Sequence, residues 1–147
     1  MKYILILFLI VSCNCTKAQS SEHFEDGYFR SLLLHIELMK EYNKSLDTVF
    51  VSKDSHLKDF SGSVNGVFIK MVGEEFVQLK TEKKHSLTLL VIHPLEYEEN
   101  KSFIIVSTFG VSRKRNNYTM LNSGSSKVEI KYDCENGNYK YDIVSLH

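Results

Sequence analysis

The 147-residue chain carries 18 basic and 18 acidic side chains, so it has no formal net charge. This balance argues against nucleic acid as a partner, because binding to a phosphate backbone depends on an excess of Lys and Arg. We expect an export segment over residues 1–18 and a single α+β domain over residues 19–147, since about 130 residues suffice for one core.

The N-terminus has the composition of a signal peptide. Lys2 precedes an unbroken run of nine apolar residues, 3–11. A helix of this length is too short to cross the roughly 30 Å of hydrocarbon in a bilayer. We therefore expect the run to be the apolar centre of an export signal and not a transmembrane anchor.

Two cleavage sites follow the apolar run. Residues 10–13, Ile-Val-Ser-Cys, resemble the lipobox of bacterial lipoproteins, which implies that Cys13 becomes a lipidated N-terminus anchored in a membrane of the cell envelope. Residues 16–18, Thr-Lys-Ala, resemble instead the site of ordinary signal peptidase, which releases a soluble periplasmic or secreted protein. The lipobox fits at all four positions, so lipidation is favoured and the second site is the alternative. The whole chain, with its short leader ending in Lys-Ala-Gln, is similar to small envelope proteins of Bacteroidota-type bacteria, which indicates a setting and implies no activity.

Residues 21–45 have the periodicity of an amphipathic helix. Apolar residues recur at steps of three and four. Acidic residues stand near the start of the segment, and Lys40 and Lys44 stand near its end, as the helix dipole favours. The stripe consists of Phe24, Tyr28, Leu32, Ile36 and Met39. We expect one face of this helix to be covered by the rest of the domain.

After Asp47 the pattern changes to short runs of β-branched and aromatic residues, and we expect no further helix. The predicted strands are 48–52, 64–72, 76–80, 87–93, 102–112, 118–121, 127–134 and 139–146. Their short connections favour antiparallel neighbours. Residues 102–111 are apolar on both alternating sets, as in a central strand, and Gly110 indicates a bulge near its end.

Asn136-Gly137 predicts a two-residue type I′ turn in a C-terminal hairpin. In that register the facing residues have numbers that sum to 273. The predicted pairs are Cys134 with Tyr139, Tyr132 with Tyr141, Ile130 with Ile143, Asp133 with Lys140 and Lys131 with Asp142. Cys134 then lies on the core face, so we expect a buried, inert thiol. Cys15 is expected in the tether and not in a disulfide with Cys134.

The order of elements predicts an N-terminal helix packed on a curved antiparallel sheet, similar by analogy to the cystatin-like and nuclear-transport-factor-like group. The alternative is a β-meander barrel or sandwich with the helix as a cap. The analogy is one of fold and carries no function.

No residues can be assigned to catalysis, to a cofactor or to a metal. The six histidines lack the spacing of an HExxH helix or a zinc finger, and the chain has neither a Gly-rich phosphate loop nor a G-x-S-x-G elbow. The candidate partner-binding residues are Arg113, Lys114 and Arg115, at a predicted hairpin tip. An aromatic group is expected either in the core or along a concave face; it comprises Tyr118, Tyr132, Tyr139, Tyr141, Phe103 and Phe109.

These features favour a non-enzymatic exported binding module whose sheet face or hairpin tips contact a small ligand or another envelope protein. A small envelope enzyme with a site in the concavity of the sheet is one alternative. An inhibitor or immunity-type partner that uses residues 113–115 is the other.

Overall fold

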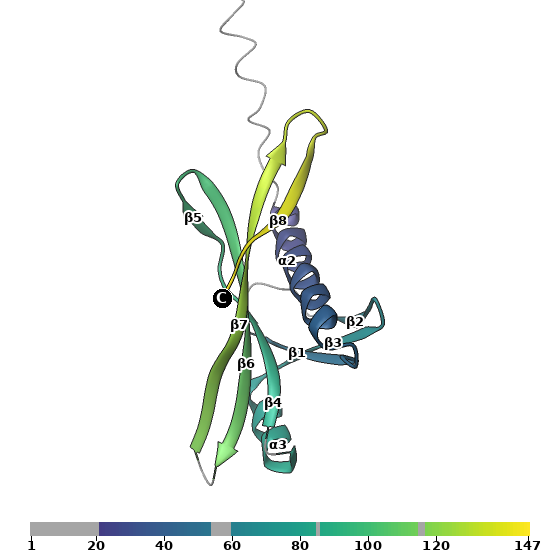
Figure 1. The fold of residues 1–147 in the computed structure, drawn as a ribbon, viewed down its shortest axis with the longest axis vertical. Coiled ribbons are helices and arrows are strands. Elements are labelled where there is room, and N and C mark those ends of the chain that lie inside the picture. Colours follow the sequence, from purple (N-terminus) through teal and green to yellow (C-terminus); the bar gives the residue numbers. More distant parts are fainter. Residues whose placement is uncertain (1–20, 54–59, 85, 115–116) are drawn as a thin grey trace, which may run out of the picture.

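The computed structural model describes residues 21–53, 60–84, 86–114 and 117–147. Helix α2 (Ser21–Tyr42) lies beside a strongly twisted sheet, and the long hairpin of β6 (Lys101–Lys114) and β7 (Asn117–Asp133) runs along the longest axis (Figure 1). Among the described residues, no helix combines the length and the apolar composition needed to cross a membrane.

The described strands form one open eight-stranded sheet, so the fold is mixed α+β and the strands form neither a closed barrel nor two packed sheets. The order is β2-β3-β1-β4-β6-β7-β8, and β5 also pairs with β6. The remaining strands are β1 (Thr48–Ser52), β2 (Ser61–Val64), β3 (Val67–Val72), β4 (Ser86–Ile92), β5 (Glu96–Glu98) and β8 (Asn138–Leu146).

The sheet is rich in antiparallel pairs, but β1 pairs in parallel with both β3 and β4. The expectation of wholly antiparallel neighbours is therefore wrong at this end of the sheet. Parallel strands need a crossover of about a dozen residues or more. Strand β2 lies in the connection from β1 to β3, and helix α3 (Glu74–Lys84) lies in the connection from β3 to β4, so both crossovers reach this length.

Residues 76–80, predicted as a strand, belong to helix α3. Glu74 and Glu75 stand in its first turn, where negative charge is favoured by the helix dipole. The amide of Phe76 donates to the carbonyl of Gly73 at 3.1 Å, which starts the helical turn. The pair Phe76-Val77 has a high strand propensity, but here both side chains pack on the sheet from a helix.

The two helices cover opposite faces of the sheet, because alternate residues of each strand enter different clusters. Leu32 and Ile36 of α2 pack on one face, against Val49, Val51, Val67, Ile69, Met71, Leu90, Ile92, Ile104 and Val106. Phe76 and Val77 of α3 pack on the other, with Val72, Leu87, Leu89, Val111, Phe50, Val91 and Phe109. The predicted apolar stripe of α2 is confirmed from Tyr28 to Met39, while the side chain of Phe24 lies outside the described residues. The central position of β6, between β4 and β7, is also confirmed.

The predicted strands 118–121 and 127–134 are parts of the single strand β7. Thr108 pairs with Gly124 and Phe109 pairs with Asn122, so Ser123 is an extra residue on β7. A bulge was expected at Gly110, but it lies nearby on the partner strand. Gly124 has a φ of +154°, and its amide donates to Asn122 Oδ1 at 2.9 Å, which holds the bulge in place.

The turn between β7 and β8 differs from the predicted type I′ turn. Tyr132 pairs with Tyr139 and Asp133 with Asn138, which leaves a four-residue loop, 134–137. The carboxylate of Asp133 accepts hydrogen bonds from the amides of Glu135 at 3.0 Å and Asn136 at 3.3 Å. Gly137 has a φ of +65°. The Asp133 side chain thus organises a longer loop in which Gly137 alone takes the left-handed conformation.

From Val128 to Asp133 the register is therefore shifted by two residues from the predicted one. A shift of two leaves every side chain on the same face, because the side-chain period of a strand is two. The predicted charge pairs persist as diagonal contacts, with Lys140 Nζ 2.8 Å from Asp133 Oδ2 and Lys131 Nζ 3.8 Å from Asp142 Oδ2. Cys134 stands in the loop and is exposed, so the prediction of a buried thiol is wrong.

Candidate interaction surface

Of the candidate partner-binding residues, the structure describes Arg113 fully. It is the penultimate residue of β6, and its guanidinium carbon lies 5.4 Å from the centre of the Tyr118 ring on β7. The backbone of Lys114 is described, but its side chain, the whole of Arg115 and the lipidation candidate Cys13 lie outside the described residues. The C-terminal end of β6, which contains Arg113, lies at one end of the longest axis (Figure 1).

The adjoining part of β7 is paired on one side only. Residues 117–122 pair with 109–114 of β6, whereas β8 pairs with β7 over Ser126–Asp133, and His147 exchanges backbone hydrogen bonds with Ser125. In the part of the chain that the structure describes, no strand pairs with the other edge of residues 117–122. Every second residue of such an edge directs its N–H and C=O groups outward. We call residues 117–122 the distal edge.

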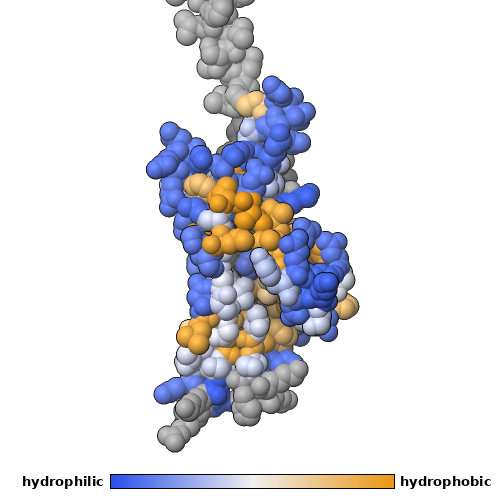
Figure 2. Space-filling view, viewed as in Figure 1, coloured by the Kyte–Doolittle hydropathy of each residue, from blue (hydrophilic) through white to orange (hydrophobic). Residues whose placement is uncertain are grey.

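The distal edge exposes apolar side chains on both faces of the sheet. Tyr118 is 40% exposed, Met120 50% and Leu121 66%. Met120 faces Val111 of the α3 cluster, and Leu121 faces Gly110 on the opposite side. Hydrophobic atoms gather at the surface above the β6–β7 turn (Figure 2). Contiguous exposed apolar residues of this kind are typical of interaction sites.

The other described edges of the sheet are protected against pairing. Strand β2 has only four residues, and β8 carries Lys140, Asp142 and a bulge at Val144. Short edges, charged side chains and bulges are devices that prevent association of strand edges. The distal edge, Asn-Tyr-Thr-Met-Leu-Asn, has no charged residue and no proline. It is therefore the described edge best suited to contact another molecule.

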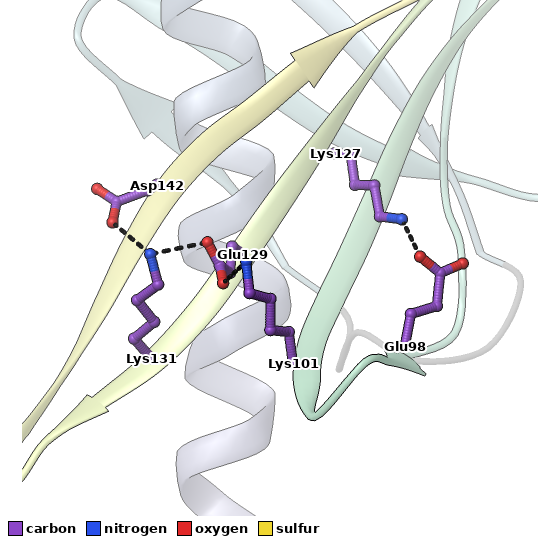
Figure 3. Close-up of polar contacts among 6 residues, drawn as sticks. All are labelled: Glu98, Lys101, Lys127, Glu129, Lys131 and Asp142. Carbon is purple, nitrogen blue, oxygen red and sulfur yellow. Dashed lines mark hydrogen bonds and ion pairs between the residues drawn. The ribbon is translucent and has the colours of Figure 1, made fainter.

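The other half of the hairpin carries a network of charged residues on the sheet face opposite α2 (Figure 3). Glu129, whose side chain is 3% exposed, lies 3.3 Å from Lys101 Nζ and 2.8 Å from Lys131 Nζ. Lys131 also contacts Asp142, and Lys127 Nζ lies 2.5 Å from Glu98 Oε2. The hydrogen bond from Lys131 lowers the pKa of Glu129, and the same bond raises the pKa of Lys131. The six side chains sum to zero charge, so the network is electrically compensated.

Sequence reasoning missed this network, although a signal was present. Lys127, Glu129 and Lys131 alternate along β7, which places all three on one face. The carboxylate of Glu129 then lies between two ammonium groups, that of Lys131 on the same strand and that of Lys101 on β6. Glu98 ends the short strand β5, where its carboxylate accepts a hydrogen bond from Lys127.

A second polar group is buried between α2 and the sheet. His35 Nδ1 lies 2.8 Å from Ser126 Oγ, and His35 Nε2 lies 2.8 Å from Thr108 Oγ1. Burial lowers the pKa of His35 to about 4, so its ring is neutral near pH 7. A neutral imidazole donates through one nitrogen and accepts through the other, and each hydroxyl can take the complementary role. His35 therefore joins α2 to β6 and β7 as a satisfied core group.

The predicted aromatic group does not gather on one face. A side chain at Gly27 of α2 would contact Tyr141, whereas Phe109 packs with the α3 cluster on the other side of the sheet. The rings of Tyr132 and Tyr139 contact each other at 5.0 Å between centres. The six residues are divided between the two faces of the sheet, so they do not line one common surface.

The described residues contain no group of three or more His, Cys, Asp and Glu side chains that could hold a metal ion. Cys134 lies beyond the end of β7 opposite to the distal edge, in the loop before β8. Comparisons with protein-family models, curated proteins and solved structures found no match, so function is inferred from the distal edge itself.

Proposed function

We propose that this protein is an exported, lipid-anchored binding module without a catalytic role, and that it contacts another protein of the cell envelope through the distal edge. The observation that carries the proposal is the edge itself: six uncharged strand residues, unpaired on one side within the described chain, with three large exposed apolar side chains. In proteins that function as monomers, such edges are usually protected against pairing, as β2 and β8 are here.

The positions of the proposed anchor and of the distal edge along the molecule support this proposal. Cys13 precedes the start of α2, Ser21, by eight residues. Helix α2 begins in the upper half of Figure 1, whereas β6 ends and β7 begins at the lower end. An anchor at Cys13 would therefore leave the distal edge pointing away from the membrane. Strand β6 alone, with 14 residues, spans about 45 Å at roughly 3.3 Å per residue.

The shape of the edge favours a protein over a small ligand. Small molecules bind in concave pockets that bury most of their surface. A strand edge offers instead a linear row of N–H and C=O groups with side chains on two faces, which an extended polypeptide matches. The analogy with the cystatin-like and nuclear-transport-factor-like group remains a proposal of fold, and the proposed function does not depend on it.

Mass spectrometry of the mature N-terminus tests the anchor. We expect an acylated Cys13 as the first residue. A protein that starts at an unmodified Gln19 would contradict the anchor and would leave the binding surface as a property of a soluble exported protein.

In-cell crosslinking tests the surface. A photoreactive amino acid at position 120 should give a discrete adduct with another envelope protein, because Met120 lies on the distal edge. Position 68 is the matched control, since Phe68 is 62% exposed on β3. Equal adducts from both positions, or none from position 120, would refute the proposed surface.

A further inference from the structure

We infer that a group of tyrosines, at the end of the molecule where α2 begins, contacts the headgroup layer of the membrane and fixes how the protein stands on it. The inference rests on the proposed anchor at Cys13 and adds to it a second contact with the same lipid surface. The group consists of Tyr97, Tyr132, Tyr139 and Tyr141. We call these four residues the tyrosine belt.

The belt lies on one face of the sheet, the face that α2 covers. Tyr97 of β5 pairs with Ser102, and Ser102 pairs in turn with Ile130 of β7, which packs in the core beneath α2. Tyr141 of β8 also pairs with Ile130. Tyr132 stands two residues beyond Ile130, so it and its partner on β8 project to the same face. Paired residues of antiparallel strands share a face, as do residues two positions apart on one strand.

The belt lies at the end of the molecule nearest to the proposed anchor. Strand β6 begins, β7 ends, and β8 and α2 begin in the upper half of Figure 1. The eight residues from Cys13 to Ser21 span at most about 28 Å. A membrane that holds Cys13 is therefore within reach of this end, whereas the other end of β6, with 14 residues, is about 45 Å further away.

The two most exposed tyrosines of the belt lie at a similar height. Tyr97 is 70% exposed and is level with Ile130, while Tyr132 is 47% exposed and lies two residues further along β7. At roughly 3.3 Å per residue, the difference is about 7 Å. The headgroup layer of one leaflet is about 5–8 Å thick. Both rings therefore fit within the same headgroup layer.

Tyrosine has the chemistry that this layer favours. Its ring is apolar and its hydroxyl is polar, so tyrosine is enriched where the hydrocarbon of a membrane meets water. The charged residues nearby limit how deeply the belt enters. Glu99 lies in the turn between β5 and β6, and Glu135 lies in the loop between β7 and β8. Carboxylates are costly in hydrocarbon, so the belt lies among the headgroups and not below them.

Lipid photocrosslinking tests the inference. The acylated protein is purified from membranes, checked by mass spectrometry and incorporated into vesicles of phosphatidylethanolamine and phosphatidylglycerol. A photoreactive amino acid at position 97 or 132 should form at least tenfold more lipid adduct than one at position 42. Position 42 is the matched control, because Tyr42 is 83% exposed but ends α2, a helix of 22 residues, about 30 Å from its start.

A substitution tests whether the rings themselves hold this end on the lipid. Tyr97→Asp should reduce at least threefold the lipid adducts formed from position 132, whereas Tyr42→Asp should leave them unchanged. Both side chains are largely exposed, and urea denaturation checks that both variants fold as the wild type does. Equal lipid adducts from positions 97, 132 and 42, or no loss in Tyr97→Asp, would overturn the inference. So would protein adducts from position 97 in place of lipid adducts.

The outcomes separate this inference from the proposed function. An acylated protein that forms no lipid adducts from positions 97 and 132 would overturn the belt and leave the anchor in place. A protein that starts at an unmodified Gln19 would overturn the anchor, and the belt with it. Crosslinking from position 120 in cells reads the distal edge independently of both results.

Discussion

The two halves of the β6–β7 hairpin consist of the same pair of strands but differ in what surrounds them. In the half near β8, Ile104, Val106 and Val128 are fully buried and the opposite face carries the compensated network around Glu129. In the half near the turn, β7 has lost β8 as a neighbour, and Tyr118, Met120 and Leu121 are exposed. The first half is buried and compensated in charge, whereas the second is the half through which we propose that the protein contacts a partner. Substitutions should therefore affect folding in one half and association in the other.

The largest expected effect is on folding, at the contact between α2 and the sheet. Leu32 is fully buried in the main core, so Leu32→Ala should lower the free energy of unfolding by about 3–4 kcal/mol through lost burial and a residual cavity. Leu121→Ala, at an exposed apolar position, is the matched control and should change it by less than about 0.5 kcal/mol. Urea denaturation measures both values. Similar losses from the two variants would contradict the division between the halves.

The second effect is a dependence of stability on pH through His35. Its pKa falls from 6.5 to about 4 on folding, so between these values the unfolded chain binds more protons than the folded one. Stability is therefore complete above pH 6.5 and decreases as the pH falls toward 4. The shift corresponds to at most about 3 kcal/mol, at 1.36 kcal/mol per pKa unit.

Comparison of the wild type with His35→Gln isolates this contribution. The variant keeps a side chain that can donate to one hydroxyl and accept from another, but it has no imidazole to protonate. Its free energy of unfolding should fall less than that of the wild type between pH 6.5 and 4. Parallel curves for the two proteins would show that His35 does not supply the dependence.

A smaller loss of stability is expected from Glu129→Gln. The substitution leaves Lys101 and Lys131 close together without the carboxylate that lies between them. The variant should be less stable than the wild type at low salt, and added salt should reduce the difference by screening the two lysines. Asp142→Asn, which removes a longer and more exposed contact at 3.8 Å, is the control and should have a weaker effect. An equal loss at low and high salt would indicate packing rather than charge.

Faces of strands were more predictable from sequence than their partners. From Val128 to Asp133 the register of β7 and β8 differs by two residues from the prediction, yet these side chains keep their faces, because the pattern encodes a period of two and not a pairing. The Asn136-Gly137 signal was outweighed by the hydrogen bonds that the loop amides donate to the carboxylate of Asp133. Helix α3 was missed because Phe76-Val77 has the local composition of a strand. The packing of this helix on the sheet depends on residues that are distant in the sequence, such as Val111.

The candidate surface and the buried histidine illustrate the same limit. The hydroxyl partners of His35 lie 73 and 91 positions away in the sequence, at Thr108 and Ser126, and no local pattern connects them. The distal edge is defined by the point at which β8 stops pairing with β7, which only the register of the sheet reveals. The basic residues Arg113, Lys114 and Arg115 were predicted as a candidate binding site. The neighbouring residues 118–121 were predicted as a strand, but nothing in the sequence showed that this strand would have an unpaired edge.

The smallest effect on stability is expected where the effect on association is greatest. Met120 is half exposed, and its replacement by Lys removes little buried surface, so the free energy of unfolding should change by less than about 0.5 kcal/mol. A lysine on the edge should nevertheless oppose pairing with another strand, since charged edge residues are a common protection against such contacts. Met120→Lys should thus abolish the crosslinks formed at the distal edge, read from a photoreactive group at position 118, while urea denaturation stays unchanged. If the variant instead lost stability by several kcal/mol, the edge would belong to the folded core, and the exposure of Tyr118, Met120 and Leu121 would have to be explained by folding and not by a partner.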